Sequence, residues 1–160
     1  MAKTRNVFVV MLRLLALGAT LCATIVMATS HESTTFFGLS LEAKFQYTPA
    51  LKVLVVVNAV VAAYSLLVLF ISPNSRLSHF LVTTDVLVAI LLVGALAAAG
   101  SVSYVGRKGN PHAGWLPICD QVRNYCNQVM WSLICAFTGV LAYTVIAVYG
   151  IHTVVHPLLT

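Results

Sequence analysis

Four long apolar runs dominate the chain, and polar segments separate them. The runs cover about residues 7–29, 50–71, 80–105 and 129–151. Each has roughly twenty residues or more, the length that an α-helix needs to cross hydrocarbon about 30 Å thick. The runs are apolar on all sides, without the alternation of a lipid-facing strand, and four strands are too few to close a barrel. The pattern predicts an all-α membrane protein, a four-transmembrane-helix bundle forming a single domain over residues 1–160.

The segments between the runs are short. Residues 30–49 and 106–128 form the longer polar loops, and residues 72–79 contain the turn signal Ser-Pro-Asn-Ser. None of these loops is large enough to hold a separate catalytic domain. A cleaved signal peptide is an alternative for the first run. That run is too long for a signal core, contains Arg13 and lacks a small-x-small cleavage site followed by a soluble domain.

The composition agrees with lipid as the solvent. Apolar residues make up 60% of the 160 residues. Charged residues make up only 8%, compared with about 25% in an ordinary soluble domain. The net charge is +5, but the nine Lys and Arg are scattered singly or in one pair and form no basic stripe. This distribution argues against nucleic acid as a partner.

The orientation follows from the ends of the chain and from the cysteines. An even number of spans places both termini on one side. The overall count of Lys and Arg does not favour cytoplasmic termini, but the first helix often dominates topology, and Lys3 and Arg5 precede it. Cys119 and Cys126 share one loop, as expected where disulfides persist. We therefore expect cytoplasmic termini, a cytoplasmic loop at 72–79 and two extracellular loops.

Two charged residues lie well inside the runs. Arg13 is roughly 9 Å into the first run and Asp85 roughly 8 Å into the third, at 1.5 Å per residue. The first and third helices run in the same direction, so both residues lie at a similar depth. Because an isolated charge in hydrocarbon is costly, we predict an intramembrane ion pair. The alternatives are independent snorkelling of Arg13 to the headgroups and a transport or proton-relay role.

Cys119 and Cys126 are the most distinctive pair in the second long loop. In a continuous helix their Cα atoms would be roughly 10.5 Å apart, whereas a disulfide needs less than about 7 Å. A disulfide therefore requires a break in the chain between them. We favour this loop disulfide over two free thiols on a short helix. Trp115 and Trp131 are expected to be interfacial anchors.

Small and weakly polar residues recur inside the runs. Gly94 and Ala98 are predicted to allow close helix packing within the bundle, with contacts between subunits as the alternative. Asn58 is predicted to add a hydrogen bond between helices. Cys22 and Cys135 are expected to be small packing residues. Because no His or Cys cluster forms a ligand set, we expect no metal. We also expect no cofactor and no catalytic residue.

Several motifs together resemble a known plant family. They are Leu12-Arg-Leu-Leu-Ala16, Ala43-Lys-Phe-Gln-Tyr-Thr-Pro-Ala-Leu-Lys-Val-Leu54 leading to Asn58-Ala, Thr84-Asp85, and Trp115-Leu-Pro-Ile-Cys119 followed by Cys126. With these motifs, nearly the whole chain resembles the Casparian strip membrane domain proteins, in their CASP-like branch. The resemblance implies four MARVEL-like spans, cytoplasmic termini and plasma-membrane residence. It also implies an Arg in the first span and an Asp in the third, which Arg13 and Asp85 match. Within the second motif, Tyr47 and Pro49 are expected to anchor the loop at the membrane interface.

The resemblance also implies a function. The strip-forming members assemble into membrane scaffolds that restrict lateral diffusion and recruit wall-modifying enzymes. They carry a signature like Glu-Thr-Leu-Pro-Phe in the first extracellular loop, whereas residues 34–42 here read Thr-Thr-Phe-Phe-Gly-Leu-Ser-Leu-Glu. We therefore expect a CASP-like, non-enzymatic scaffold without an implied role in the strip itself. It would form homo-oligomers or hetero-oligomers with paralogues, contact membrane lipids and recruit membrane or wall enzymes. The alternatives are a channel, a transporter or its accessory subunit, and a membrane enzyme that uses paired thiols.

Overall fold

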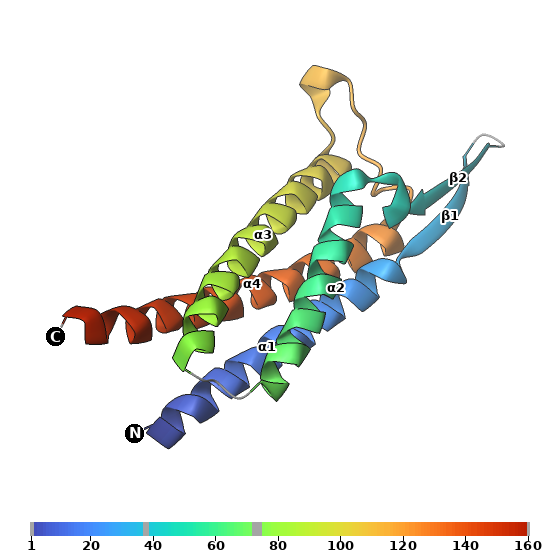
Figure 1. Ribbon diagram of the computed structural model, residues 1–160. Coiled ribbons are helices and arrows are strands. Elements are labelled where there is room, and N and C mark those ends of the chain that lie inside the picture. The colour runs from blue at the N-terminus through green and yellow to red at the C-terminus, as the bar shows by residue number, and fades with distance from the viewer. Residues whose placement is uncertain (1, 37–38, 72–74, 160) are drawn as a thin grey trace.

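Four long helices form the body of the protein. A computed structural model describes residues 2–36, 39–71 and 75–159. The helices are α1 (Ala2–Ala28), α2 (Pro49–Phe70), α3 (Ser75–Lys108) and α4 (Arg123–Leu159). Each contains an apolar stretch long enough to cross a membrane, and they form an elongated bundle (Figure 1). The predicted all-α, four-span membrane bundle is confirmed.

Three of the helices, α1, α3 and α4, extend several residues beyond the apolar runs that predicted them. The third helix starts at Ser75 and ends at Lys108, and the fourth starts at Arg123, six residues before the predicted span begins. The reason is physical: hydropathy reports which residues lie in hydrocarbon, whereas backbone hydrogen bonding continues into the polar flanks. Arg107 and Lys108 occupy the last turn of α3, where cations interact favourably with the helix dipole.

The short connection between α2 and α3 is described only in part. The predicted cytoplasmic loop 72–79 includes residues 72–74, which lie outside the described residues. From Ser75 onward the chain is already helical, so the segment 75–79 belongs to α3 rather than to a loop.

A β-hairpin occupies most of the segment predicted as a polar loop at 30–49. Strand β1 (His31–Phe36) pairs antiparallel with β2 (Leu39–Lys44), in a register that sets His31 opposite Lys44. The short 3₁₀ helices are η1 (Phe45–Tyr47), which leads into α2, and η2 (Pro111–Ala113). The hairpin and the segment between α3 and α4 project from one end of the bundle, away from the start of α1 and the end of α4 (Figure 1).

The interior combines alanines with a few large side chains such as Leu92 and Tyr143, and large apolar side chains cover the outside. Buried alanines line the seams between helices, among them Ala16, Ala23, Ala99 and Ala136. Exposed positions include Met11, Leu67 and Ile90. Lipid tails are as apolar as leucine, so membrane helices gain most where small residues let their backbones approach.

Candidate functional site

The structure brings Arg13 and Asp85 together across α1 and α3. Arg13 Nη2 donates to Asp85 Oδ2 at 2.6 Å, and Nη1 donates to Oδ1 at 3.2 Å. Arg13 is 7% exposed and Asp85 3% exposed, so the guanidinium turns into the bundle and not toward the headgroups. Two parallel hydrogen bonds match the planar guanidinium to the carboxylate and make this one of the stronger kinds of ion pair.

A second helix supplies another donor to the same carboxylate. The Tyr64 hydroxyl on α2 donates to Asp85 Oδ1 at 2.9 Å. Asp85 therefore joins α1, α2 and α3 through one side chain. We did not predict Tyr64, although a tyrosine within an apolar span is itself a signal, because a buried phenol usually finds a hydrogen-bond partner.

The fourth helix is joined to α2 through Ser65, the residue that follows Tyr64. The Ser65 and Tyr143 hydroxyls are hydrogen-bonded to each other, and both residues are fully buried. Closer to the hairpin end, Ser132 on α4 donates to the Ala23 carbonyl on α1 at 2.8 Å. Side-chain hydrogen bonds thus link every helix to at least one other. The arrangement neutralises charge and satisfies polar groups, which suits a structural role.

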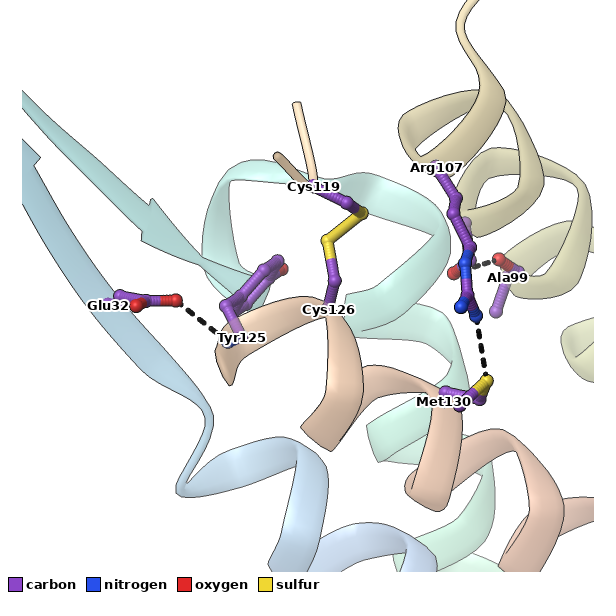
Figure 2. The surroundings of a disulfide bond; sticks show 8 residues. Glu32, Ala99, Arg107, Cys119, Tyr125, Cys126 and Met130 are labelled. Carbon is purple, nitrogen blue, oxygen red and sulfur yellow. Dashed lines mark hydrogen bonds between the residues drawn. A yellow bond between two sulfur atoms is a disulfide. The ribbon is translucent and has the colours of Figure 1, made fainter. Parts of the chain in front are cut away.

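Cys119 and Cys126 form the predicted disulfide just before and inside the first turn of α4 (Figure 2). Their Cα atoms are 5.7 Å apart. The required break is a turn in which the N–H groups of Gln121 and Val122 both donate to the Ile118 carbonyl. The disulfide therefore joins this turn to the start of α4.

The hairpin is attached to the same region by an acidic side chain. Glu32 Oε2 accepts a hydrogen bond from the Tyr125 backbone N–H at 2.9 Å (Figure 2). Glu32 Oε1 accepts one from the Asn124 side-chain amide at 3.3 Å. Tyr125 lies in the first turn of α4, where backbone N–H groups lack partners within the helix. A carboxylate there also complements the positive end of the helix dipole. Glu32 is a long-range cap that sequence reasoning missed.

The predicted interface anchors lie on the outer surface. Trp115 and Trp131 are 61% and 60% exposed, and Trp115 forms an isolated β-bridge with Asn110. Tyr47 is also exposed, and its hydroxyl donates to Glu42 at 3.4 Å. Pro49 is the first residue of α2, where a missing N–H costs nothing.

Glu42 also pairs with Lys44 on the hairpin. Their side chains are 2.6 Å apart. The hydrogen bond to Lys44 lowers the pKa of Glu42, and the same bond raises the pKa of Lys44. Because the pKa of Glu42 is lower in the folded than in the unfolded chain, its pairing with Lys44 stabilises the fold above the unfolded-state pKa. This stabilisation is lost as the pH falls through the folded-state pKa. Because both groups are exposed to solvent, we assign this pair little weight in stability.

The packing prediction for Gly94 and Ala98 within the bundle is wrong. Ala98 lies on the exposed face of α3, and a Cβ added at Gly94, also exposed, would meet nothing within 4 Å. The glycines that permit close approach are Gly139 and Gly150, where an added Cβ would lie 3.1 Å from Thr20 and 2.9 Å from Val82. Spacing of small residues along one helix does not reveal which face meets a neighbour.

The prediction for Asn58 is also wrong. Its amide donates to the Leu54 carbonyl of its own helix at 2.8 Å. The residue is fully buried, and its side-chain oxygen has no hydrogen-bond partner among the described residues. Competition from the local backbone explains the error, because a carbonyl four residues earlier is always within reach of such a side chain.

Cys22 and Cys135 lie face to face between α1 and α4, with their sulfur atoms 2.8 Å apart. Within the described part of the chain, no group of three or more His, Cys, Asp or Glu side chains is arranged to hold a metal ion.

Comparison with known proteins places the chain in a plant membrane family. Residues 2–142 match the family model of the Casparian strip membrane protein domain. CASP-like protein 1C2 of Vitis vinifera is 52% identical over 154 residues, which cover 96% of each chain. CASP-like protein 1C1 of Sorghum bicolor is 51% identical, covering 99% of this chain and 98% of its own. CASP-like protein 1C1 of Arabidopsis thaliana is 46% identical, covering 98% and 95%.

No solved structure matches the chain. The relatives nevertheless align over nearly their whole lengths, and the family model spans all of the first three helices and more than half of α4. The protein is a multi-pass membrane protein that belongs to the Casparian strip membrane protein domain family, in its CASP-like branch.

Proposed function

We propose that this protein is a non-enzymatic scaffold of the plasma membrane that associates laterally with copies of itself and with paralogues. The observation that carries the proposal is an exposed face of small side chains on α3. This face, the α3 small-residue face, consists of Gly94, Ala97, Ala98 and Ser101. Its members follow the spacing of one helix side over about two turns.

The bundle does not use the α3 small-residue face. Its members are exposed, and nothing lies within 4 Å of a Cβ added at Gly94. Small residues let the backbones of two membrane helices approach closely, and such approach is a main source of helix association in lipid. The neighbouring exposed positions Ile90 and Val93 are large and would border the contact. The face therefore suits a helix of another subunit.

The intramembrane charges support a structural role over transport. Both oxygens of the Asp85 carboxylate accept hydrogen bonds, from Arg13 and Tyr64. The pair is buried between helices of one chain. A residue that carries ions or protons must exchange partners, whereas this one is held by two other helices. A channel, a transporter or an accessory subunit is therefore the less favoured alternative.

The same proposal includes an orientation. The termini lie in the cytoplasm, and the hairpin and the disulfide-bonded segment lie outside the cell, where disulfides persist. The outer parts would then offer surfaces to recruited membrane or wall enzymes, as the family resemblance implies.

The test is subunit contact in native membranes. The double substitution Gly94→Leu with Ala98→Leu is expected to lower cross-linked oligomer yield several-fold, because the larger side chains hold the helices apart. Expression and melting temperature of the protein should stay near wild type, since both positions are exposed.

A matched control exists on α2. Ala59 and Ala63 have the same four-residue spacing and are also exposed. The double substitution Ala59→Leu with Ala63→Leu should leave the oligomers intact. If the α3 variant cross-links as the wild type does, the proposed contact through the α3 small-residue face is wrong. If the wild type itself is monomeric in native membranes, the scaffold function is refuted.

A further inference from the structure

An apolar cavity lies beside the disulfide, between the ends of α3 and α4 that face the hairpin. Its volume is about 220 Å³. The residues that form its walls include Leu51, Gly100, Ser103, Val129, Met130 and Leu133. Most of these groups are apolar, and the hydroxyl of Ser103 is already donated to the Ala99 carbonyl at 2.7 Å. The cavity therefore suits a hydrocarbon group.

A second, polar cavity of about 210 Å³ adjoins it. Arg107 and the two disulfide-bonded cysteines, Cys119 and Cys126, line both cavities. The polar cavity is lined by Arg107, Lys108 and Arg123, against one carboxylate, Asp120. The excess of positive charge suits an anion.

Arg107 stands between the two cavities and has donors to spare. In the described part of the chain its guanidinium makes a side-chain hydrogen bond only to the Met130 sulfur, at 3.0 Å (Figure 2). A thioether is a weak acceptor, whereas a guanidinium carries five N–H donors whose geometry matches a phosphate. Arg107 thus reaches across from α3 toward α4 without a strong anionic partner.

Aromatic residues place these cavities at the depth of the lipid headgroups. Tyr104 on α3 is exposed and forms part of the wall of the apolar cavity. Trp131 on α4 is also exposed, and it directly follows Met130, another wall residue. Tyr and Trp gather where hydrocarbon meets headgroups. The apolar cavity therefore lies at the edge of the hydrocarbon, and the cationic residues at 107, 108 and 123 lie at the level of lipid phosphates.

We propose that the two cavities form one binding site for an anionic phospholipid of the leaflet on the hairpin side. Part of an acyl chain fills the apolar cavity, and the headgroup phosphate binds Arg107, with Lys108 and Arg123 around it. The disulfide keeps the cationic rim next to the cavity by joining the turn at Cys119 to α4. This site does not depend on the scaffold function.

The test is lipid binding to the purified, delipidated full chain in detergent, followed by native mass spectrometry. Dioleoylphosphatidylglycerol is expected to bind at least ten-fold more tightly than dioleoylphosphatidylcholine. Arg107→Gln should remove most of this preference, because a charge-assisted hydrogen bond is worth about ten-fold or more in affinity. Gly100→Leu should weaken both lipids by filling the cavity, since a Cβ at this position meets nothing within 4 Å.

Glycerol phosphate separates a lipid site from a simple phosphate site. Glycerol phosphate should not bind at the concentrations at which the lipid saturates the site. Lys52→Gln and Gly18→Leu are the matched controls, because Lys52 is an exposed cation at the same end of the bundle and a Cβ at Gly18 is unobstructed. Both should bind lipid as the wild type does.

Four results would overturn the proposal. They are equal binding of the two lipids to the wild type, an unchanged preference in Arg107→Gln, unchanged binding in Gly100→Leu, and binding of glycerol phosphate as tight as that of the lipid. If Gly100→Leu does not fold, Ser103→Leu fills the same cavity and takes its place.

Discussion

In the described part of the chain, more hydrogen bonds between helices converge on the Asp85 carboxylate than on any other side chain, since Arg13 on α1 and Tyr64 on α2 both donate to it. Asp85→Asn would leave the buried Arg13 guanidinium without a counter-charge. We expect a loss of about 3–5 kcal/mol in the free energy of unfolding, the usual cost of breaking a buried pair from one side. Thermal unfolding in detergent, together with oligomer size, measures the effect.

The double variant Arg13→Met with Asp85→Leu is the control for this prediction. It removes both charges, so no uncompensated ion remains, and it should lose much less stability than Asp85→Asn. A melting temperature for Asp85→Asn equal to that of the wild type would show that the pair does not hold the bundle.

Glu32 offers a second prediction for a single residue. Glu32→Gln should cost about 1 kcal/mol, because the carboxylate caps the first turn of α4 and complements its dipole. Faster hydrogen exchange at the Tyr125 amide would report the loss directly. Glu42→Gln is the matched control on the other strand, because Glu42 is exposed and has its bonds with Lys44 and Tyr47 rather than with α4. Equal exchange in the two variants would contradict the capping role.

At the scale of elements, the contact between α1 and α4 depends on the absence of a side chain at Gly139. A Cβ there would lie 3.1 Å from Thr20 Cγ2. Gly139→Leu should therefore destabilise the protein by about 1–3 kcal/mol through overpacking. Thermal unfolding is compared with that of Gly18→Leu, which adds the same side chain to an open position. Equal melting temperatures of the two variants would mean that the contact can widen at no cost.

The disulfide restrains the element that precedes α4. Replacing both Cys119 and Cys126 by Ser should lower stability by about 2.5 kcal/mol, the chain-entropy value for a ring of roughly eight residues. Hydrogen exchange should increase first around the turn at residues 118–122 and at the start of α4. Uniform protection in both forms would show that the turn is held by its other contacts.

At the scale of the whole molecule, the proposed orientation predicts accessibility from one side. In a background without Cys22 and Cys135, a cysteine introduced at Thr35 should react with an impermeant maleimide on intact cells. One introduced at Leu159 should react only after permeabilisation, because the hairpin and the end of α4 lie at opposite ends of the bundle (Figure 1). The reverse pattern of labelling would invert the topology.

The helices could be predicted from the sequence, but their faces could not. Apolar length alone identified four spans, because lipid demands about twenty apolar residues for each crossing. Gly94 and Ala98 were assigned to the wrong face, since exterior and interior positions are equally apolar in a membrane helix. Asn58 is buried, but its amide bonds to its own helix and not to a neighbouring one. The hairpin was missed, although Leu39, Leu41 and Ala43 alternate with polar residues, the usual signal of a strand.

Chain chemistry by itself determined the solvent, the number of crossings, the two costly charges and the cysteine pair that needed a turn. These features follow from the free energy of transferring each segment or charge from water into hydrocarbon. That free energy depends on the residues themselves and not on which other segments lie beside them. Tertiary structure alone decided that Tyr64 shares the Asp85 carboxylate, that Glu32 caps α4 and that Arg107 stands over an apolar cavity. Each of these depends on distances between segments far apart in the chain, which helix packing sets and local sequence does not encode.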